Sequence, residues 1–287
     1  MHMHFHPSTW LLAASAIAIT LDTAAASGIL EVDLVFPRNK TYAPEDFFPI
    51  VFAFQNPSLA RYLNPHISYT ISNENNRSTS IARSHDLRWT NWSTEQNLFF
   101  AYAYFSEFGS EGQGTWTVDW SLSWESCDEE AFSNIAYHPR ARMISNSSSF
   151  GLSFSIGNAG EEVDLVSATA GQTCPGEQGV IISITDRTMQ VPLQVDWAGS
   201  EATNDSCVVV ETSTPTMTPD ACRVEIDEAA AASMRTSLTA TLCRGVNPPD
   251  DCPEIEDDEN DAQRLAVLGA SVLLGACGPL SFFRLWW

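Results

Sequence analysis

Basic residues are scarce in this sequence. Lys and Arg together number 14, against 36 Asp and Glu, and the formal net charge is −22. Lys40 is the only lysine. A protein that binds a phosphate backbone needs a basic patch that releases counterions. The composition therefore excludes nucleic acid as a partner and disfavours contact with an anionic membrane surface, except through a lipid anchor.

Catalytic and cofactor motifs are also lacking. The chain has no H-E-x-x-H, G-x-S-x-G, Walker or G-x-G-x-x-G pattern, and no two cysteines have the C-x-x-C spacing of a thiolate zinc site. Ser84-His85-Asp86 has the composition of a catalytic triad, but real triads assemble from positions that are distant in sequence. We therefore predict no catalytic residues, no metal ligands and no cofactor, and the sequence favours a protein that is not an enzyme.

Paired carboxylates leave one class of enzyme open. Four acidic residues follow a Trp-rich segment closely, namely Glu125, Asp128, Glu129 and Glu130. Two carboxyl groups about 5 Å, or about 6.5 to 9.5 Å, apart are sufficient for glycoside hydrolysis. In a chain this acidic, however, composition alone favours a solvated acidic loop. A glycan-active hydrolase is the less favoured alternative.

Both ends of the chain are apolar. The run from Trp10 to Leu21, followed by Ala24-Ala25-Ala26, predicts a secretory signal peptide over residues 1–26. The apolar tail predicts a GPI-type signal over residues 263–287, with Asn260 as the lipid-anchor site. A transmembrane helix is the alternative for the tail, although the tail lacks a Lys/Arg cluster. We expect an extracellular protein on the outer face of the plasma membrane or in the cell wall.

The cysteines and glycosylation sequons agree with secretion. Of seven cysteines, Cys277 lies in the tail. Removal of the tail leaves an even set that can form disulfides: Cys127, Cys174, Cys207, Cys222, Cys243 and Cys252. Six cysteines allow 15 connectivities, and the sequence does not choose among them. The predicted N-glycosylation sites are Asn39, Asn76, Asn91, Asn146 and Asn204.

Alternating and continuous apolar segments predict an all-β fold. Residues 29–36 alternate, which predicts a strand with Glu31 and Asp33 on its solvent-facing side. The continuous apolar run at residues 49–54 predicts a central strand that is covered on both faces. Further strands are expected at residues 67–71, 98–105, 115–124, 150–156, 180–184, 191–197 and 207–210. We predict an antiparallel, immunoglobulin-like β-sandwich over residues 27–211.

Tryptophan alternates with polar residues in the clearest of these segments. Over residues 115–124, Trp116, Val118, Trp120, Leu122 and Trp124 share one face, and threonine, serine and Asp119 share the other. The aromatic face suits either a hydrophobic core or a platform for sugar rings. We favour the core, because burial of each large side chain contributes about 1.5 to 3 kcal/mol. For sugar contact, Trp89 and Trp92 are the candidate residues.

The amino-acid composition changes after residue 211. Residues 212–219 form a Thr/Pro linker. Asp227 then precedes a helical pattern within residues 220–245, and we expect Cys222 and Cys243 to fix this helix to the sandwich. The dense acidic run within residues 246–262 predicts an extended stalk before the anchor.

A resemblance supports this organisation. The segment from Gly28 through Pro37 and Tyr42 to Pro44, continued by Phe48 to Asn56, resembles the opening of a fungal secreted family catalogued as domain of unknown function 7136. The likeness extends through Gly114-Thr-Trp116 to the late helix. It implies a fungal cell-surface or secreted protein with a lipid-anchor tail, and it transfers no catalytic residues.

The sequence thus predicts an extracellular, GPI-anchored β-sandwich with a structural or adhesive role. The expected partners are a cell-wall polysaccharide or another surface protein. A carbohydrate-binding module is the main alternative.

Overall fold

The computed structural model describes residues 27–76, 80–92, 97–133, 142–171, 179–191, 206–211, 218–246, 248–250 and 252. Its strands are β1 (Gly28–Phe36), β2 (Thr41–Tyr42), β3 (Phe48–Gln55), β4 (His66–Asn73), β5 (Ser80–Asp86), β6 (Leu98–Phe105), β7 (Gly114–Cys127), β8 (Met143–Ile156), β9 (Gly179–Gln190) and β10 (Ser206–Val210). Its helices are α1 (Glu129–Ser133), α2 (Leu165–Thr169) and α3 (Glu228–Cys243), with short 3-10 segments η1 (Pro57–Tyr62) and η3 (Ala221–Arg223). The predominance of strands confirms the prediction of a mainly β protein.

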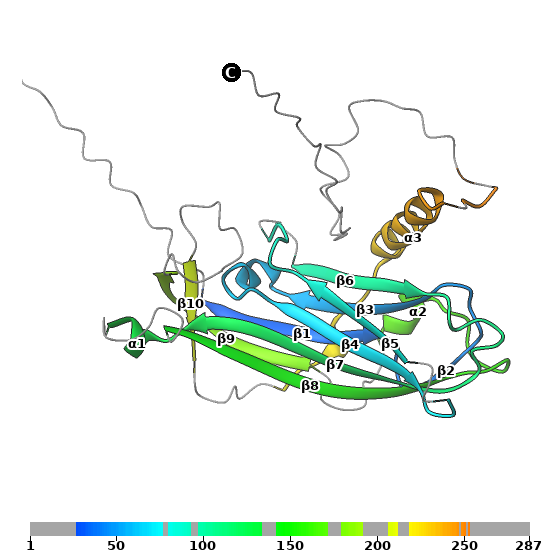
Figure 1. The fold of residues 1–287 in the computed structure, drawn as a ribbon, viewed down its shortest axis with the longest axis horizontal. Coiled ribbons are helices and arrows are strands. Elements are labelled where there is room, and N and C mark those ends of the chain that lie inside the picture. The colour runs from blue at the N-terminus through cyan, green and yellow to red at the C-terminus, as the bar shows by residue number, and fades with distance from the viewer. Residues whose placement is uncertain are drawn as a thin grey trace, which may run out of the picture.

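The strands form two five-stranded sheets (Figure 1). Sheet A has the order β10-β9-β1-β3-β6, and sheet B has the order β2-β8-β7-β4-β5. Neighbouring strands are antiparallel except for β2 and β8, which pair in parallel. The antiparallel sheets were predicted. The immunoglobulin-like topology is not confirmed, because that fold has seven or nine strands in its two sheets, whereas the described strands form two sheets of five.

One hydrophobic core joins the two sheets. The ring of Phe52 on β3 lies 5.3 Å from the rings of both Tyr69 on β4 and Trp120 on β7, measured between centroids. Trp116 is 1% exposed and Trp120 is 2% exposed. The aromatic face of β7 is therefore a core face, as predicted.

The outer face of sheet A is covered as well. Val51 and Ala53, which point away from Phe52 on β3, are fully buried. The segments α2 and η3 contact β1, and α3 contacts α2. The buried residues from η3 into α3 belong to the same core cluster: Ala221, Val224, Ile226, Ala231 and Met234. The predicted central strand with two covered faces is thus confirmed. The helix begins where expected, because Asp227 accepts a hydrogen bond from the backbone N–H of Ala230.

The prediction that Glu31 and Asp33 face solvent is wrong. Glu31 is 3% exposed and Asp33 is fully buried. Glu31 accepts hydrogen bonds from the backbone N–H of Asp220 and, at 2.6 Å, from Nη2 of Arg223. The η3 segment, distant in sequence, therefore lies on this side of β1, and the alternation of residues 29–36 could not reveal it.

Two disulfides of different span cross-link the described chain. Cys127 at the end of β7 bonds to Cys207 on β10, so this bond joins sheet B to sheet A over 80 residues of sequence. Cys243 bonds to Cys252, only nine residues further on. Cys243 therefore closes a local loop and does not fix α3 to the sheets, contrary to the prediction. Cys222 is also disulfide-bonded.

Several predicted features lie outside the described residues. They are the signal peptide, the strand expected after Val191, the Thr/Pro linker up to residue 217, the acidic run beyond Cys252, Cys174, Asn204 and the tail with Asn260. Within the described residues, none of the helices is both long enough and apolar enough to span a bilayer.

We expect the Cys127–Cys207 bond to contribute more stability than Cys243–Cys252. A cross-link that closes a longer loop restricts the unfolded chain more, and loss of a native disulfide typically costs about 2 to 5 kcal/mol. The double variant Cys127→Ala/Cys207→Ala should therefore lose about that much free energy of unfolding in urea titrations. The matched variant Cys243→Ala/Cys252→Ala should lose less, and an equal or larger loss would contradict this assignment.

Candidate functional site

Hydroxyl groups dominate the outer face of sheet B. The strand register places Ser84, Ser68, Ser121 and Ser149 in one row across β5, β4, β7 and β8. A second row is Ser80, Ser72, Thr117 and Ser153. Between these two rows lies a third that consists of Ala82, Thr70, Asp119 and Gly151. These side chains are exposed or half-buried, so the face is open to solvent.

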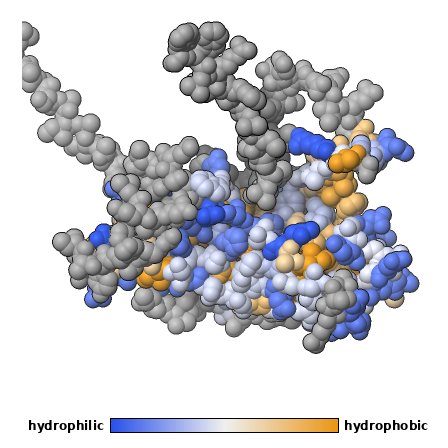
Figure 2. Space-filling model, viewed as in Figure 1, coloured by the Kyte–Doolittle hydropathy of each residue, from blue (hydrophilic) through white to orange (hydrophobic). Residues whose placement is uncertain are grey.

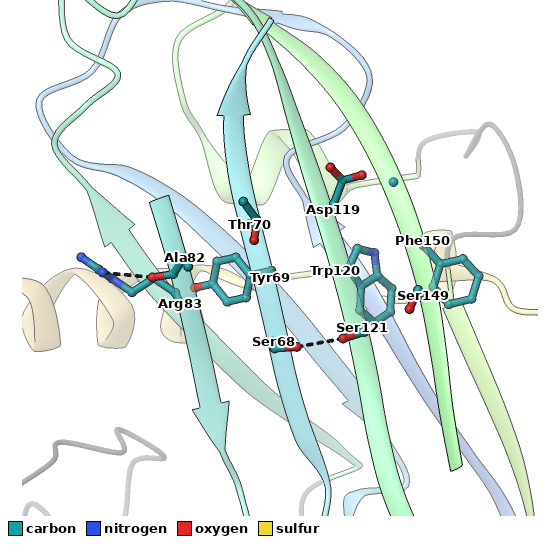
Figure 3. Close-up of a pocket in the computed structure, with 11 residues that line it drawn as sticks. Ser68, Tyr69, Thr70, Ala82, Arg83, Asp119, Trp120, Ser121, Ser149 and Phe150 are labelled. Atoms are coloured by element: carbon teal, nitrogen blue, oxygen red, sulfur yellow. Dashed lines mark hydrogen bonds between the residues drawn. The ribbon is translucent and has the colours of Figure 1, made fainter. Parts of the chain in front are cut away.

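A shallow groove of about 510 Å³ lies over the middle of this face (Figure 3). We call it groove 1. The outward residues that line it are Ser68, Thr70, Ala82, Asp119, Ser121, Ser149 and Gly151. The lining also includes four residues of one inward row, namely Arg83, Tyr69, Trp120 and Phe150. The hydroxyls of Ser68 and Ser121 are 2.8 Å apart, so these two neighbouring strands share a hydrogen bond at the groove. Each hydroxyl keeps further capacity, because it carries one donor hydrogen and two acceptor lone pairs.

A second hollow, of about 350 Å³, lies toward the end of the same face. This groove 2 is lined by Asn64, His66, Arg88, Ser123, Trp124, Glu125, Ser145 and Asn146. The amide of Asn64 donates to Oε2 of Glu125 at 3.5 Å. Figure 2, in the same view as Figure 1, shows mostly pale colours of moderate hydropathy over the middle of the visible face.

An ion pair fixes the guanidinium of groove 2. Asp86 accepts hydrogen bonds from Nε of Arg88 at 2.8 Å and from Nη2 at 2.6 Å. These bonds to Arg88 lower the pKa of Asp86 below its ordinary value. Arg88 is thus held as a donor at the rim of the groove.

The two candidate sugar-contact tryptophans differ in exposure. Trp89, which follows Arg88 in sequence, is 64% exposed. Trp92 is 5% exposed, and its ring packs against Phe54 and Phe99 with centroids 5.4 Å and 4.9 Å away. Trp92 is part of the core, so a sugar contact there would require its ring to leave the core. For Trp89, contact with a sugar remains a prediction.

The acidic residues near the end of β7 have different partners, and Glu130 is exposed. Asp128 caps α1 by accepting from the backbone N–H of Ala131 at 3.0 Å, and Glu129 pairs with Arg187. Glu125 lines groove 2 and Asp119 lines groove 1. Six strand residues separate these two carboxylates, which corresponds to roughly 20 Å at about 3.3 Å per residue. That separation exceeds the spacing that glycoside hydrolysis requires.

The residues of Ser84-His85-Asp86 point to different faces of β5. Ser84 and Asp86 pair with the outward residues Ser68 and His66, whereas the imidazole of His85 stacks on Tyr69 at 5.6 Å. Burial, with a smaller contribution from His66, lowers the pKa of His85 to about 4. The neutral ring therefore belongs to the core side of the sheet, and the three side chains do not converge.

The predicted glycosylation sites differ in accessibility. Asn39, Asn76 and Asn91 are exposed, whereas Asn146 is half-buried in groove 2. Their glycosylation remains a prediction. Within the part of the chain that the structure describes, no three His, Cys, Asp or Glu side chains gather as a metal site.

A comparison with protein families identifies the chain's relatives. The family described as Domain of unknown function (DUF7136) matches residues 25–252. This chain belongs to that family. No curated protein matches the sequence. The DUF7136 region thus includes both sheets, both grooves and α3.

The DUF7136 domain also has an enclosed polar cluster on sheet A. Oδ2 of Asp33 accepts from Nε2 of Gln55 at 3.0 Å, while Oδ1 has no hydrogen-bond partner. A Cβ added to Gly179 would lie 2.1 Å from this Oδ1, so only glycine fits opposite Asp33. Burial, and secondly the charge of Glu31, raises the pKa of Asp33 from 3.8 to about 7. The cluster attaches the η3 segment to β1. Because it is closed off from solvent, it offers no site to a ligand.

We expect Asp33 to contribute stability in acid that is lost by neutral pH, while His85, whose folded pKa is lowered to about 4, contributes in the opposite direction over an overlapping range. Its folded pKa of about 7 lies above the ordinary value of 3.8. Between these pH values the folded protein therefore keeps a proton on Asp33 that the unfolded chain releases, and the contribution of Asp33 to stability falls as pH rises through this window. Relative to the wild type, Asp33→Asn should therefore gain about 2 to 4 kcal/mol between pH 4.5 and 8.

Urea unfolding at pH 4.5, 6 and 8 measures this effect. The exposed residue Asp46 supplies the matched control, because Asp46→Asn removes a surface carboxyl and leaves Asp33 in place. An Asp33→Asn variant whose stability relative to the wild type stays constant between pH 4.5 and 8 would show that the buried carboxyl is not the cause.

Proposed function

We propose that this protein is a non-enzymatic component of the fungal cell surface, held outside the plasma membrane by a GPI anchor, with a structural or adhesive role. The observation that carries the proposal is the open, hydroxyl-lined outer face of sheet B. On that face the side chains are mostly hydroxyls and are suited to holding a partner by hydrogen bonds.

The remaining support comes from the chain's chemistry. Disulfides persist in oxidising compartments such as the cell exterior, and Cys127–Cys207 and Cys243–Cys252 fit that environment. The apolar segments at the two ends fit a leader and an anchor signal. The excess of acidic residues keeps the protein soluble at high density on a surface and excludes nucleic acid.

A carbohydrate-binding module is the second candidate. It is favoured by Trp89, whose 64% exposed ring follows Arg88 of groove 2. Such modules use aromatic rings as stacking surfaces for sugars. Trp92, which would extend the platform, is buried, so the candidate depends on a single exposed ring among the described tryptophans.

Cells that display the full chain should lose it on treatment with phosphatidylinositol-specific phospholipase C, because that enzyme cuts the lipid of a GPI anchor. These cells should also attach to insoluble fungal wall glucan more than cells without the chain, and the lipase should abolish the difference. Immunoblotting of medium and membranes, together with counts of attached cells, measures both effects.

A chain that ends at residue 262 provides the control, since it should enter the medium without lipase. Two outcomes would contradict the proposal. One is a protein that stays in the membrane after lipase with the mass of residues 263–287 still present. The other is attachment that does not depend on the displayed chain.

A further inference from the structure

We infer that grooves 1 and 2 form one continuous site, which binds a single neutral polysaccharide chain lying along β7. This inference rests on the proposed surface role and names its partner. It assigns the contact to the hydroxyl-lined face and not to exposed aromatic rings.

The two grooves adjoin along β4 and β7 and are one outward position apart on β8. On β4, His66 of groove 2 is the next outward residue after Ser68 of groove 1. On β7, Ser123 of groove 2 follows Ser121 of groove 1 in the same way. On β8, Ser147 is the one outward position between the two linings. From Asp119 to Glu125 the combined site is roughly 20 Å long, which suits an extended chain better than a compact molecule.

The charges of the linings favour a neutral ligand. Groove 1 has one outward carboxylate, Asp119, because Arg83 lies in the row of the buried Tyr69 and its guanidinium lies 5.9 Å from the ring of Phe105. Groove 2 has Glu125 and Arg88. Arg88 is paired with Asp86, so the remaining charges of the two linings are the carboxylates of Asp119 and Glu125, roughly 20 Å apart. A polyanion is therefore repelled and a polycation finds no dense acidic patch, whereas a neutral polymer is not repelled.

Hydrogen-bond capacity matches a polyhydroxyl chain. Serine and threonine hydroxyls both donate and accept, carboxylates only accept and guanidinium groups only donate. Sugar hydroxyls can use all three kinds of partner. Asp119 lies beside Thr70 and Ser121 in groove 1 (Figure 3), so a carboxylate that accepts from sugar hydroxyls is flanked by groups that complete the pattern.

Gly151 keeps groove 1 open over Asp119. A Cβ at this position would lie 3.0 Å from Oδ1 of Asp119, and the rest of a longer side chain would occupy the groove. Glycine inside a strand often marks a place where a ligand approaches closely. The position of Gly151 opposite Asp119 is the strongest local indication that a polysaccharide chain binds here.

A protein partner fits this face less well. The cores of protein–protein interfaces are enriched in aromatic residues and methionine and depleted in serine. The outward positions of β8 from residue 145 to 155 are all serine except Gly151. A second copy or another protein would thus find no apolar anchor on these positions.

Isothermal titration of the full chain, purified in detergent, tests the site. The probes are hexamers of β-1,3-glucose, β-1,4-glucose, β-1,4-N-acetylglucosamine and α-1,6-mannose, with hexagalacturonate as the charged comparison. We expect at least one neutral hexamer to bind, with little dependence on salt because no net charge is neutralised, and hexagalacturonate to bind at least about tenfold more weakly.

Two variants locate the contact. Gly151→Leu fills groove 1 and should lower the affinity for the bound hexamer at least about tenfold. Asp119→Asn keeps the size of the side chain and should lower it about threefold to tenfold. Ser155→Leu, on the same face of β8 but outside both grooves, should leave affinity within about twofold. Thermal unfolding confirms that each variant is folded.

The outcomes separate this inference from the surface role. If no neutral hexamer binds, or if Gly151→Leu and Asp119→Asn both bind as the wild type does, the groove site is wrong. Lipase-sensitive attachment of cells to glucan would survive that result. Loss of binding in Trp89→Ala with full binding in Gly151→Leu would also overturn the inference, and would assign the contact to the aromatic module.

Discussion

The antiparallel pairing of β7 with β8 sets the positions of the core tryptophans and of the central groove residues. Over 14 residues, Gly114 to Cys127 on β7 face Ile156 to Met143 on β8 without a break in register. Because successive side chains alternate, this register directs Trp116 and Trp120 into the core and aligns Asp119 with Gly151 outside it. A slip by one residue would exchange the two faces. The core and the grooves therefore depend on the same ladder of hydrogen bonds.

The two sheets use their outer faces differently. On sheet A, the η3 segment covers β1, and the buried carboxylate of Glu31 is satisfied by Arg223 and by the backbone of Asp220. A buried charge without such partners would cost several kcal/mol, roughly, so this face can be covered only where the partners are in place. On sheet B, the described outward residues remain accessible. Attachment of the C-terminal segment thus stabilises one face, while the other stays available to a ligand.

Sequence patterns predicted those parts of the fold in which local alternation and burial agree. The aromatic strand β7, the doubly covered β3 and the start of α3 at Asp227 are examples. The prediction missed β5 and the first half of β8, since Ser145 to Ser149 show no apolar period and become a strand only through pairing with β7. It also placed Glu31 in solvent, because nothing near β1 indicates the distant η3 segment. The grooves were missed for the same reason, as they are made by four strands in register.

Folding alone does not account for the serines of β8. Valine, isoleucine, threonine and aromatic residues are the side chains that strands prefer, and a solvated sheet face ordinarily carries charge as well. With 36 acidic residues in the chain, a face whose central rows contain only Asp119 as a carboxylate departs from the composition around it. Threonine at the outward positions of β8 would stabilise the strand more than serine does, and Glu or Lys there would make the face more soluble. A dense set of small hydroxyls on an open face, next to a glycine that preserves a groove, instead suits contact with a neutral, hydrogen-bonding chain.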